Sequence, residues 1–219
     1  MNFIYLNPDQ LRADFLGCYG HPAAQTPNID RLAAEGTRFD QCHVQHAVCT
    51  PSRCSFMTGW YPHVRGHRTL WNPLREDEPN TLKYLKQNGY EVHWAGKNDL
   101  LAQDAFDDAV DHIHLDRPGA SGDRDIFPKD HPGYWSFLYG PMTDHHTDWY
   151  RVEAAIEMLQ ARKPEDPPFM FYLPLDLPHA PFSCPQPWYD LVDPDDLPPM
   201  RPADLAGKPE FYRLIREYR

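Results

Sequence analysis

Short apolar segments typical of β-strands alternate along this chain with longer segments that have the apolar spacing of α-helices. The expected strands lie at Phe3–Leu6, Tyr90–Ala95 and Phe169–Leu173, and the expected helices begin near Thr26, Asn80 and Thr147. This alternation is typical of an α/β fold with a mostly parallel sheet. We therefore predict a single α/β domain built around such a sheet.

The helix boundaries are marked by local signals. Thr26 is a favourable N-cap, Pro27 suits the first turn, and Gly36 follows the last apolar position of the first helix. The helix from Asn80 is expected to end at Gly89. The helix from Thr147 to about Arg162 carries apolar residues at helical spacing, namely Trp149, Val152, Ile156 and Leu159.

Two segments lack such patterns. Residues 104–146 are polar and rich in Asp, His, Gly and Pro, so we interpret them as a long irregular excursion near a site and not as part of the core. From Pro164 onward the chain contains 13 of its 24 prolines, which argues against regular sheet in this tail. A short helix is expected at its end, from Glu210 to Arg219.

Charge and composition exclude several classes of partner. The formal net charge of −11 gives no basic surface for a nucleic acid, although a local cluster of cations can still bind a small anion. No apolar stretch approaches the roughly 20 residues that cross a bilayer, so no membrane partner is expected. Five scattered cysteines do not form a disulfide framework, and no leader precedes the first strand, so we expect a cytoplasmic protein.

Polar side chains follow each of the three predicted strands. Asp9 and Gln10 come after the first, Lys97 after the second and His179 after the third. Ligands of open parallel sheets bind beyond the carboxyl ends of the strands. A single site is therefore expected to collect these residues.

The segment Cys49-Thr50-Pro51-Ser52-Arg53 places a candidate nucleophile at the start of a short helix that Gly59 would end. A helix N-terminus favours anions, and the Arg53 guanidinium can donate to a tetrahedral oxyanion. A zinc site formed by His43, His46, Cys49 and Cys54 is the alternative, but it gives Pro51 and Arg53 no function.

This pentapeptide resembles the sulfatase signature Cys/Ser-x-Pro-x-Arg, whose first residue is oxidised to formylglycine. Flanking motifs strengthen the resemblance over residues 1–182, namely Leu16-Gly17-Cys18-Tyr19-Gly20-His21, Thr26-Pro27-Asn28-Ile29-Asp30-Arg31-Leu32-Ala33, Thr58-Gly59 and Ala95-Gly96-Lys97. The resemblance implies the alkaline phosphatase-like fold, a three-layer sandwich, and hydrolysis of small-molecule or saccharide sulfate esters.

The resemblance also implies roles for individual residues. Asp9 and Gln10 match metal-ligand positions, and oxidised Cys49 would be the nucleophile and would also touch the metal. Oxygen ligands favour one divalent cation, Ca²⁺ first and Mg²⁺ or Mn²⁺ as alternatives. Arg53 would stabilise the aldehyde hydrate and Lys97 would contact the sulfate. His179, in Pro178-His179-Ala180-Pro181, matches the histidine near the leaving group.

The sequence departs from the sulfatase pattern in three places. Gln10 stands where many sulfatases have Asp, which is similar to phosphonate monoester hydrolases. Asn98-Asp99 follows Lys97 where a histidine is usual, so Asp99 or His46 would have to act as the base. Two further metal ligands, a second lysine and a C-terminal subdomain are expected beyond residue 219. We therefore interpret residues 1–219 as the N-terminal part of a sulfatase catalytic domain, with a proline-rich tail from about residue 164.

Two alternatives to a sulfatase follow from these departures. A phosphonate monoester or phosphodiester hydrolase would use the same scaffold, and an inactive truncated domain would only bind sulfated ligands or a partner chain. The identity of the ester and the oligomeric state are not encoded in recognisable motifs.

Overall fold

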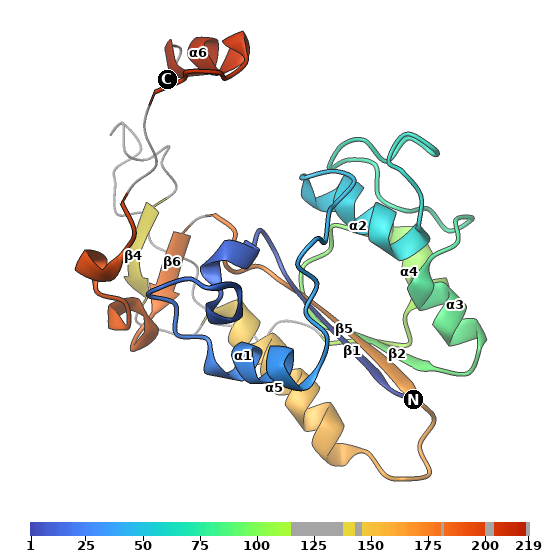
Figure 1. Ribbon diagram of the computed structural model, residues 1–219. Helices are drawn as coiled ribbons and strands as arrows, with labels where there is room; N and C mark the ends of the chain where they lie inside the picture. Colours follow the sequence, from blue (N-terminus) through green and yellow to red (C-terminus); the bar gives the residue numbers. More distant parts are fainter. Residues whose placement is uncertain (115–137, 143–145, 181, 200–203, 218–219) are drawn as a thin grey trace.

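A computed structural model of the protein describes residues 1–114, 138–142, 146–180, 182–199 and 204–217 (Figure 1). Within these residues, a parallel four-stranded sheet has the order β1 (Phe3–Pro8), β5 (Phe169–Leu175), β2 (Glu91–Trp94) and β3 (His112–Ile113). The register places Phe3 opposite Met170 and His93 opposite His112. The three predicted strands are confirmed, and β3 is an addition to them.

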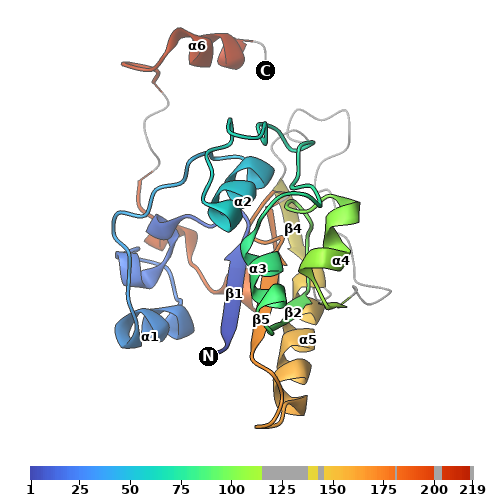
Figure 2. The same ribbon diagram turned by 90° about the vertical axis from the view of Figure 1, so that its right-hand side faces the viewer.

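Helices lie on both faces of the sheet, as the three-layer prediction requires (Figures 1 and 2). One face is covered by α2 (Cys49–Thr58), α3 (Thr81–Gln87) and α4 (Phe106–Ala109). The other face carries α5 (Thr147–Ala161). Both faces of β5 are therefore covered, which explains its continuous apolar sequence.

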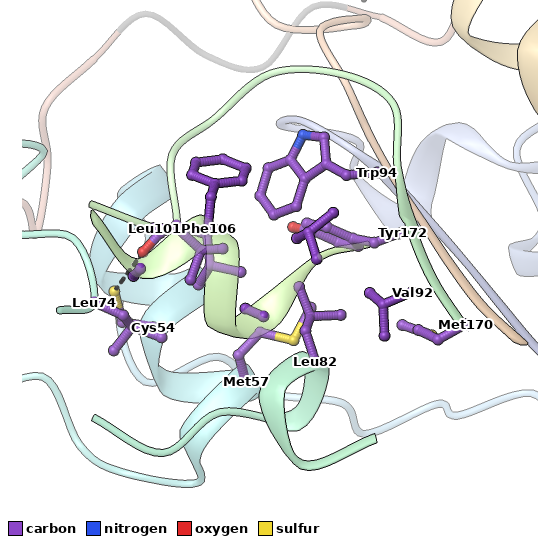
Figure 3. Close-up of a cluster of buried hydrophobic side chains, with 14 residues drawn as sticks. Cys54, Met57, Leu74, Leu82, Val92, Trp94, Leu101, Phe106, Met170 and Tyr172 are labelled. Atoms are coloured by element: carbon purple, nitrogen blue, oxygen red, sulfur yellow. Dashed lines mark hydrogen bonds between the residues drawn. The ribbon is translucent and has the colours of Figure 1, made fainter. Parts of the chain in front are cut away.

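Two clusters of buried side chains form the core. The larger one, on the side of α2, α3 and α4, includes Leu82, Trp94 and Tyr172 (Figure 3). The smaller one, on the side of α5, includes Ala155 and Phe171. Tyr172 and Phe171 are neighbours in β5, so the alternation of the strand sends them to opposite faces.

The helix ends follow the sequence signals with one exception. The Asn80 side chain caps α3 by accepting a hydrogen bond from the Lys83 backbone N at 2.9 Å. Thr26 precedes α1 (Pro27–Glu35) as predicted, but its hydroxyl does not cap the helix. It accepts from the Gly17 backbone N and donates to Asp30 Oδ1, both at 2.9 Å. These bonds tie α1 to the preceding turn.

The interpretation of residues 104–146 as an irregular excursion is wrong for its first part. Phe106, Ala109 and Val110 are buried in the larger core cluster, and β3 then joins the sheet. Acidic residues between these apolar positions face solvent and conceal the helical spacing in the composition. Residues 115–137 and 143–145 lie outside the described part of the chain.

The proline-rich tail also contains more regular structure than predicted. β6 (Phe182–Pro185) pairs in parallel with β4 (Leu138–Met142) in a separate two-stranded sheet. Short strands with a free edge tolerate proline, because not every backbone N–H is needed for pairing. The predicted terminal helix is confirmed as α6 (Glu210–Glu217).

Many large apolar side chains remain exposed. Those on α1, β1 and α5 include Ile4, Leu32 and Ile156. The apolar stripe of α5 is among them, whereas its buried positions are Asp148, Arg151 and Ala155. None of the helices in the described residues has the length and hydropathy required to cross a membrane.

Candidate active site

Asp9 stands at the carboxyl end of β1, where the pairing with β5 continues. Its backbone N donates to the Leu175 carbonyl at 3.1 Å, and the residue is only 7% exposed. Gln10 follows with a left-handed backbone, φ 64°, which is unusual for a residue with a side chain. Its side chain is exposed, so the chain turns sharply away from the strand immediately after the carboxylate.

Cys49 is the first residue of α2, as predicted. Val48 precedes it in an extended conformation, and the Ser52 backbone N donates to the Val48 carbonyl at 3.0 Å. Gly59 ends the helix with φ 75°. The Cys49 Sγ lies 3.4 Å from Asp9 Oδ1, so the thiol and the carboxylate face each other at the N-terminus of the helix.

Arg53 lies one turn further along α2 and is almost completely buried, at 3% exposure. Its Nη2 is 3.3 Å from Asp9 Oδ2, and its Nη1 donates to the Tyr172 hydroxyl at 3.2 Å. The Tyr172 hydroxyl donates in turn to Asn7 Oδ1 at 3.0 Å. The guanidinium is therefore held in one orientation from the sheet below it.

Lys97 follows β2 after Gly96, a position whose backbone conformation and close packing require glycine. Gly96 has φ 140°, and a Cβ added there would lie 2.1 Å from the Pro174 carbonyl oxygen. Lys97 then donates its backbone N to that same oxygen at 2.9 Å. Its Nζ lies 2.6 Å from Asp9 Oδ2 and 3.0 Å from Asp99 Oδ2.

His179 is positioned by the loop that follows β5. Its imidazole, the Asp9 carboxylate and the Cys49 sulfur provide donor atoms that all lie within 4.8 Å of one another. Asp148 accepts the backbone N–H groups of Asp176 and Leu177 at 3.0 and 2.8 Å, which fixes the start of this loop. Arg151 bridges Asp148 and Asp176 at 2.7 Å each.

The charges in this cluster set its protonation states. Burial alone would raise the pKa of Asp9, but hydrogen bonds from Lys97 and Cys49 and the charges of Lys97 and Arg53 lower it overall. Burial also works against the charged form of Lys97, yet its two carboxylate partners raise its pKa. Burial raises the pKa of the Cys49 thiol, and the neighbouring Asp9 raises it further. Asp9 is thus a carboxylate beside a neutral thiol.

We expect unmodified Cys49 to react slowly with iodoacetamide at pH 8, because only the thiolate reacts and the raised pKa keeps its fraction small. Asp9→Asn removes the opposing charge, so alkylation of Cys49 should accelerate about tenfold at the same pH. Mass spectrometry resolves the rate at each cysteine. Cys42, which is exposed, should not change, and buried Cys54 should stay protected if the variant is folded. An unchanged rate at Cys49 would remove Asp9 as the cause.

The donor set fits a divalent cation once residue 49 carries oxygen. Asp9 Oδ2 is occupied by Lys97 and Arg53, whereas Oδ1 faces residue 49. A thiol is a soft ligand, but an aldehyde hydrate at the same place would add hard oxygens beside the carboxylate. Asp9 and residue 49 are thus the residues that could hold the ion, with the His179 imidazole beside them.

The structure brings together Asp9, Cys49, Arg53, Lys97 and His179 as the sequence predicted, but not the Gln10 side chain. Asp99 lies in the cluster, while His46 accepts a hydrogen bond from the Val48 backbone N at 3.0 Å. Sequence reasoning missed the buried supports Tyr172 and the Asp148–Arg151 pair. Tyr172 lies in an otherwise apolar strand, and Asp148 and Arg151 lie in the first turns of α5. These positions were the only sequence signals for the three residues.

This arrangement defines the class of the protein. A parallel α/β sheet with helices on both faces, and a carboxylate, a cysteine and two cationic side chains gathered beyond the carboxyl ends of its strands, is the alkaline phosphatase-like architecture. The sulfatase family model matches residues 1–196, and the chain belongs to the sulfatase family.

Individual relatives agree with this assignment. The sulfatase YidJ of Escherichia coli K12 is 30% identical and covers 97% of this chain, and human iduronate 2-sulfatase is 28% identical and covers 96%. A solved structure of BT4656 with its substrate D-glucosamine-2-N,6-O-disulfate covers 81% of the chain with a TM-score of 0.63 and 25% identity. The phosphonate monoester hydrolase of Silicibacter pomeroyi covers 94% with a TM-score of 0.70, but at 20% identity it shows the fold alone.

The matched regions are parts of longer proteins. This chain spans 46% of YidJ and 40% of iduronate 2-sulfatase, and it covers 34% of the BT4656 chain and 47% of the phosphonate hydrolase chain. It therefore corresponds to about half the length of the relatives that it matches, or less.

Proposed function

We propose that this chain carries the nucleophile-bearing part of a sulfate ester hydrolase in which Cys49 is oxidised to formylglycine. The observation that carries the proposal is the convergence of Asp9, Cys49, Arg53 and Lys97 in one bonded cluster at the N-terminus of α2. A sulfate ester has three terminal oxygens that share a negative charge and need several fixed donors close to the nucleophile, and this cluster provides them together.

In the proposed reaction, one hydroxyl of the aldehyde hydrate at residue 49 attacks sulfur and the ester C–O–S linkage breaks at the S–O bond. In this proposal, His179 gives the departing alkoxide its proton. The second hydroxyl of residue 49 then loses a proton, its oxygen re-forms the aldehyde, and sulfate leaves with the electrons of the broken C–O bond. Arg53 and Lys97 balance the sulfate charge. A bound divalent cation, Ca²⁺ in the first place, would add positive charge for the sulfate oxygens.

The state of the thiol supports the need for oxidation. The raised pKa of Cys49 disfavours a thiolate nucleophile at neutral pH. A cysteine or serine sulfate ester also has no second hydroxyl from which the sulfate could be expelled. Asp99, ion-paired with Lys97 at 3.0 Å, is placed to take the proton of that second hydroxyl.

A sulfated saccharide is the substrate class that we propose. Human iduronate 2-sulfatase and the N-acetylglucosamine-6-O-sulfatase of Bacteroides thetaiotaomicron, which is 31% identical over 78% of this chain, are named for such substrates. The net charge of −11 does not oppose an anionic sugar, because Arg53 and Lys97 supply the local positive charge.

Gln10 favours a second candidate function, hydrolysis of phosphonate monoesters or phosphodiesters. Gln10 is uncharged where many sulfatases have a second Asp, and its side chain is exposed, so this position adds no carboxylate beside Asp9. The reaction would use the same nucleophile and cations. The two functions differ in the transferred group and not in the scaffold.

The test is to express the protein with an enzyme that oxidises this cysteine, confirm the aldehyde at residue 49 by peptide mass spectrometry, and measure kcat/KM for an aryl sulfate and an aryl phosphonate. We expect a larger value for the sulfate and dependence on added Ca²⁺, Mg²⁺ or Mn²⁺. A larger value for the phosphonate would favour the second candidate. Full activity of a sample that keeps the thiol would contradict the proposed nucleophile.

A further inference from the structure

A second group of possible metal ligands lies outside the candidate active site, on the α5 side of the sheet at the β2–β3 edge. Glu91 and His93 alternate on β2, and His112 and His114 alternate at β3. The parallel register places His93 beside His112, so these side chains share one face. Donor atoms of Glu91, His93 and His112 all lie within 4.8 Å of one another.

The buried imidazole of His93 is the informative member of this group. The residue is 5% exposed, and its Nε2 has no hydrogen-bond partner among the described residues. That nitrogen faces Glu91 Oε2 at 3.6 Å, which is too long for a hydrogen bond. An unpartnered buried nitrogen is costly, and a cation bound to it and to the neighbouring carboxylate would remove that cost.

The hydrogen bonds of His93 leave one of its ring nitrogens free to bind a metal. Its Nδ1 lies 3.1 Å from His114 Nε2, so an N–H on Nδ1 can donate there and leave the Nε2 lone pair free. A second hydrogen-bonded ring nitrogen of this kind orients most metal-bound histidines.

Both carboxylate oxygens of Glu91 are engaged by neighbouring side chains. Arg162 Nη1 donates to Oε2 at 2.6 Å. Oε1 faces His112 Nε2 at 2.8 Å. Ligand atoms of a tetrahedral zinc ion are about 3.3 Å apart, so a small opening of this pair would admit the ion.

We propose that Glu91, His93 and His112 form a zinc-binding site that joins β3 to β2, separate from the candidate active site. Two imidazoles and one carboxylate are borderline ligands that suit Zn²⁺ better than Ca²⁺ or Mg²⁺. His112 is half exposed, which leaves the fourth position open to water. His114 is a positioning residue for His93.

The experiment is a titration of the metal-free, tag-free protein with Zn²⁺, using Cys49→Ala as the background and excess Ca²⁺. This background removes the only thiol of the other candidate cluster. We expect one zinc ion per chain. His112→Gln and Glu91→Gln should each weaken binding at least about tenfold, because each removes one of three protein ligands. Co²⁺ should give a tetrahedral visible spectrum without a thiolate charge-transfer band.

His43→Gln is the matched control, because His43 is exposed and lies outside this group. It should bind zinc as the background protein does. Circular dichroism establishes that each variant is folded. Because His112 is more exposed than Glu91, its replacement is less disruptive to the fold. No zinc binding by the background protein, or binding that His112→Gln and Glu91→Gln leave unchanged, would overturn the proposal.

Discussion

Replacing Cys49 with alanine is expected to reduce sulfate ester hydrolysis at least about a thousandfold, since loss of a covalent nucleophile leaves only the contribution of binding and electrostatics. The methyl group cannot be converted to an aldehyde and cannot form a bond to sulfur. Steady-state kinetics on a preparation with confirmed aldehyde at residue 49 supply the reference. Mass spectrometry of the variant confirms that the aldehyde is absent.

Cys42→Ala is the matched control for this loss. Cys42 is exposed, lies seven positions before Cys49 and precedes α2, so its replacement should leave kcat within about twofold. Equal loss in both variants would point to misfolding. Hydrolysis by Cys49→Ala at a rate near the reference would contradict the nucleophile assignment.

Arg53→Met is expected to lower the free energy of unfolding by about 2–3 kcal/mol, because Asp9 keeps Lys97 but loses its more deeply buried cationic partner, and the Tyr172 hydroxyl loses a donor. The guanidinium is 3% exposed and contacts both Asp9 and the Tyr172 hydroxyl. Methionine fills a similar volume, so the loss reports the charge and the hydrogen bonds. Urea denaturation followed by tryptophan fluorescence gives the free energy.

Two further variants separate this effect from general damage. Arg12→Met removes an arginine whose ion pair with Asp14 is about half exposed, so the unfolding midpoint should hardly move. Adding Asp9→Asn to Arg53→Met should cost less than Asp9→Asn costs alone, because the two residues are coupled. A loss below about 1 kcal/mol in Arg53→Met would contradict the proposed strength of the buried pair.

Several residues of the candidate site could be predicted from the sequence because they stand at the ends of strands or helices. Asp9 and Lys97 each follow a strand, and Cys49 begins a helix. Gly96 marks the end of the strand before Lys97, and Gly59 marks the end of the helix that Cys49 begins. The approach of Asp9, Lys97 and His179 to one another follows from the general rule that parallel strands end at one edge. The convergence was therefore predictable without knowledge of the strand order.

Other features depended on the tertiary structure. The exposure of the Gln10 side chain follows from a left-handed backbone that no residue pattern announced. The Asp148–Arg151 pair is buried because α5 lies against the loop after β5, while the apolar stripe of that helix stays exposed. The site of Glu91, His93 and His112 exists only because β3 pairs with β2.

Local sequence patterns were enough to predict the α/β class, the main strands and helices, and the residues at the carboxyl ends of the strands. These depend on periodicity and on turn residues, which act over a few neighbouring positions. Only the tertiary structure decided which polar side chains support Arg53 and which histidines meet at the β2–β3 edge. Contacts such as that of Tyr172 with Asn7, 165 positions apart, are set by strand order and helix packing, which local patterns do not specify.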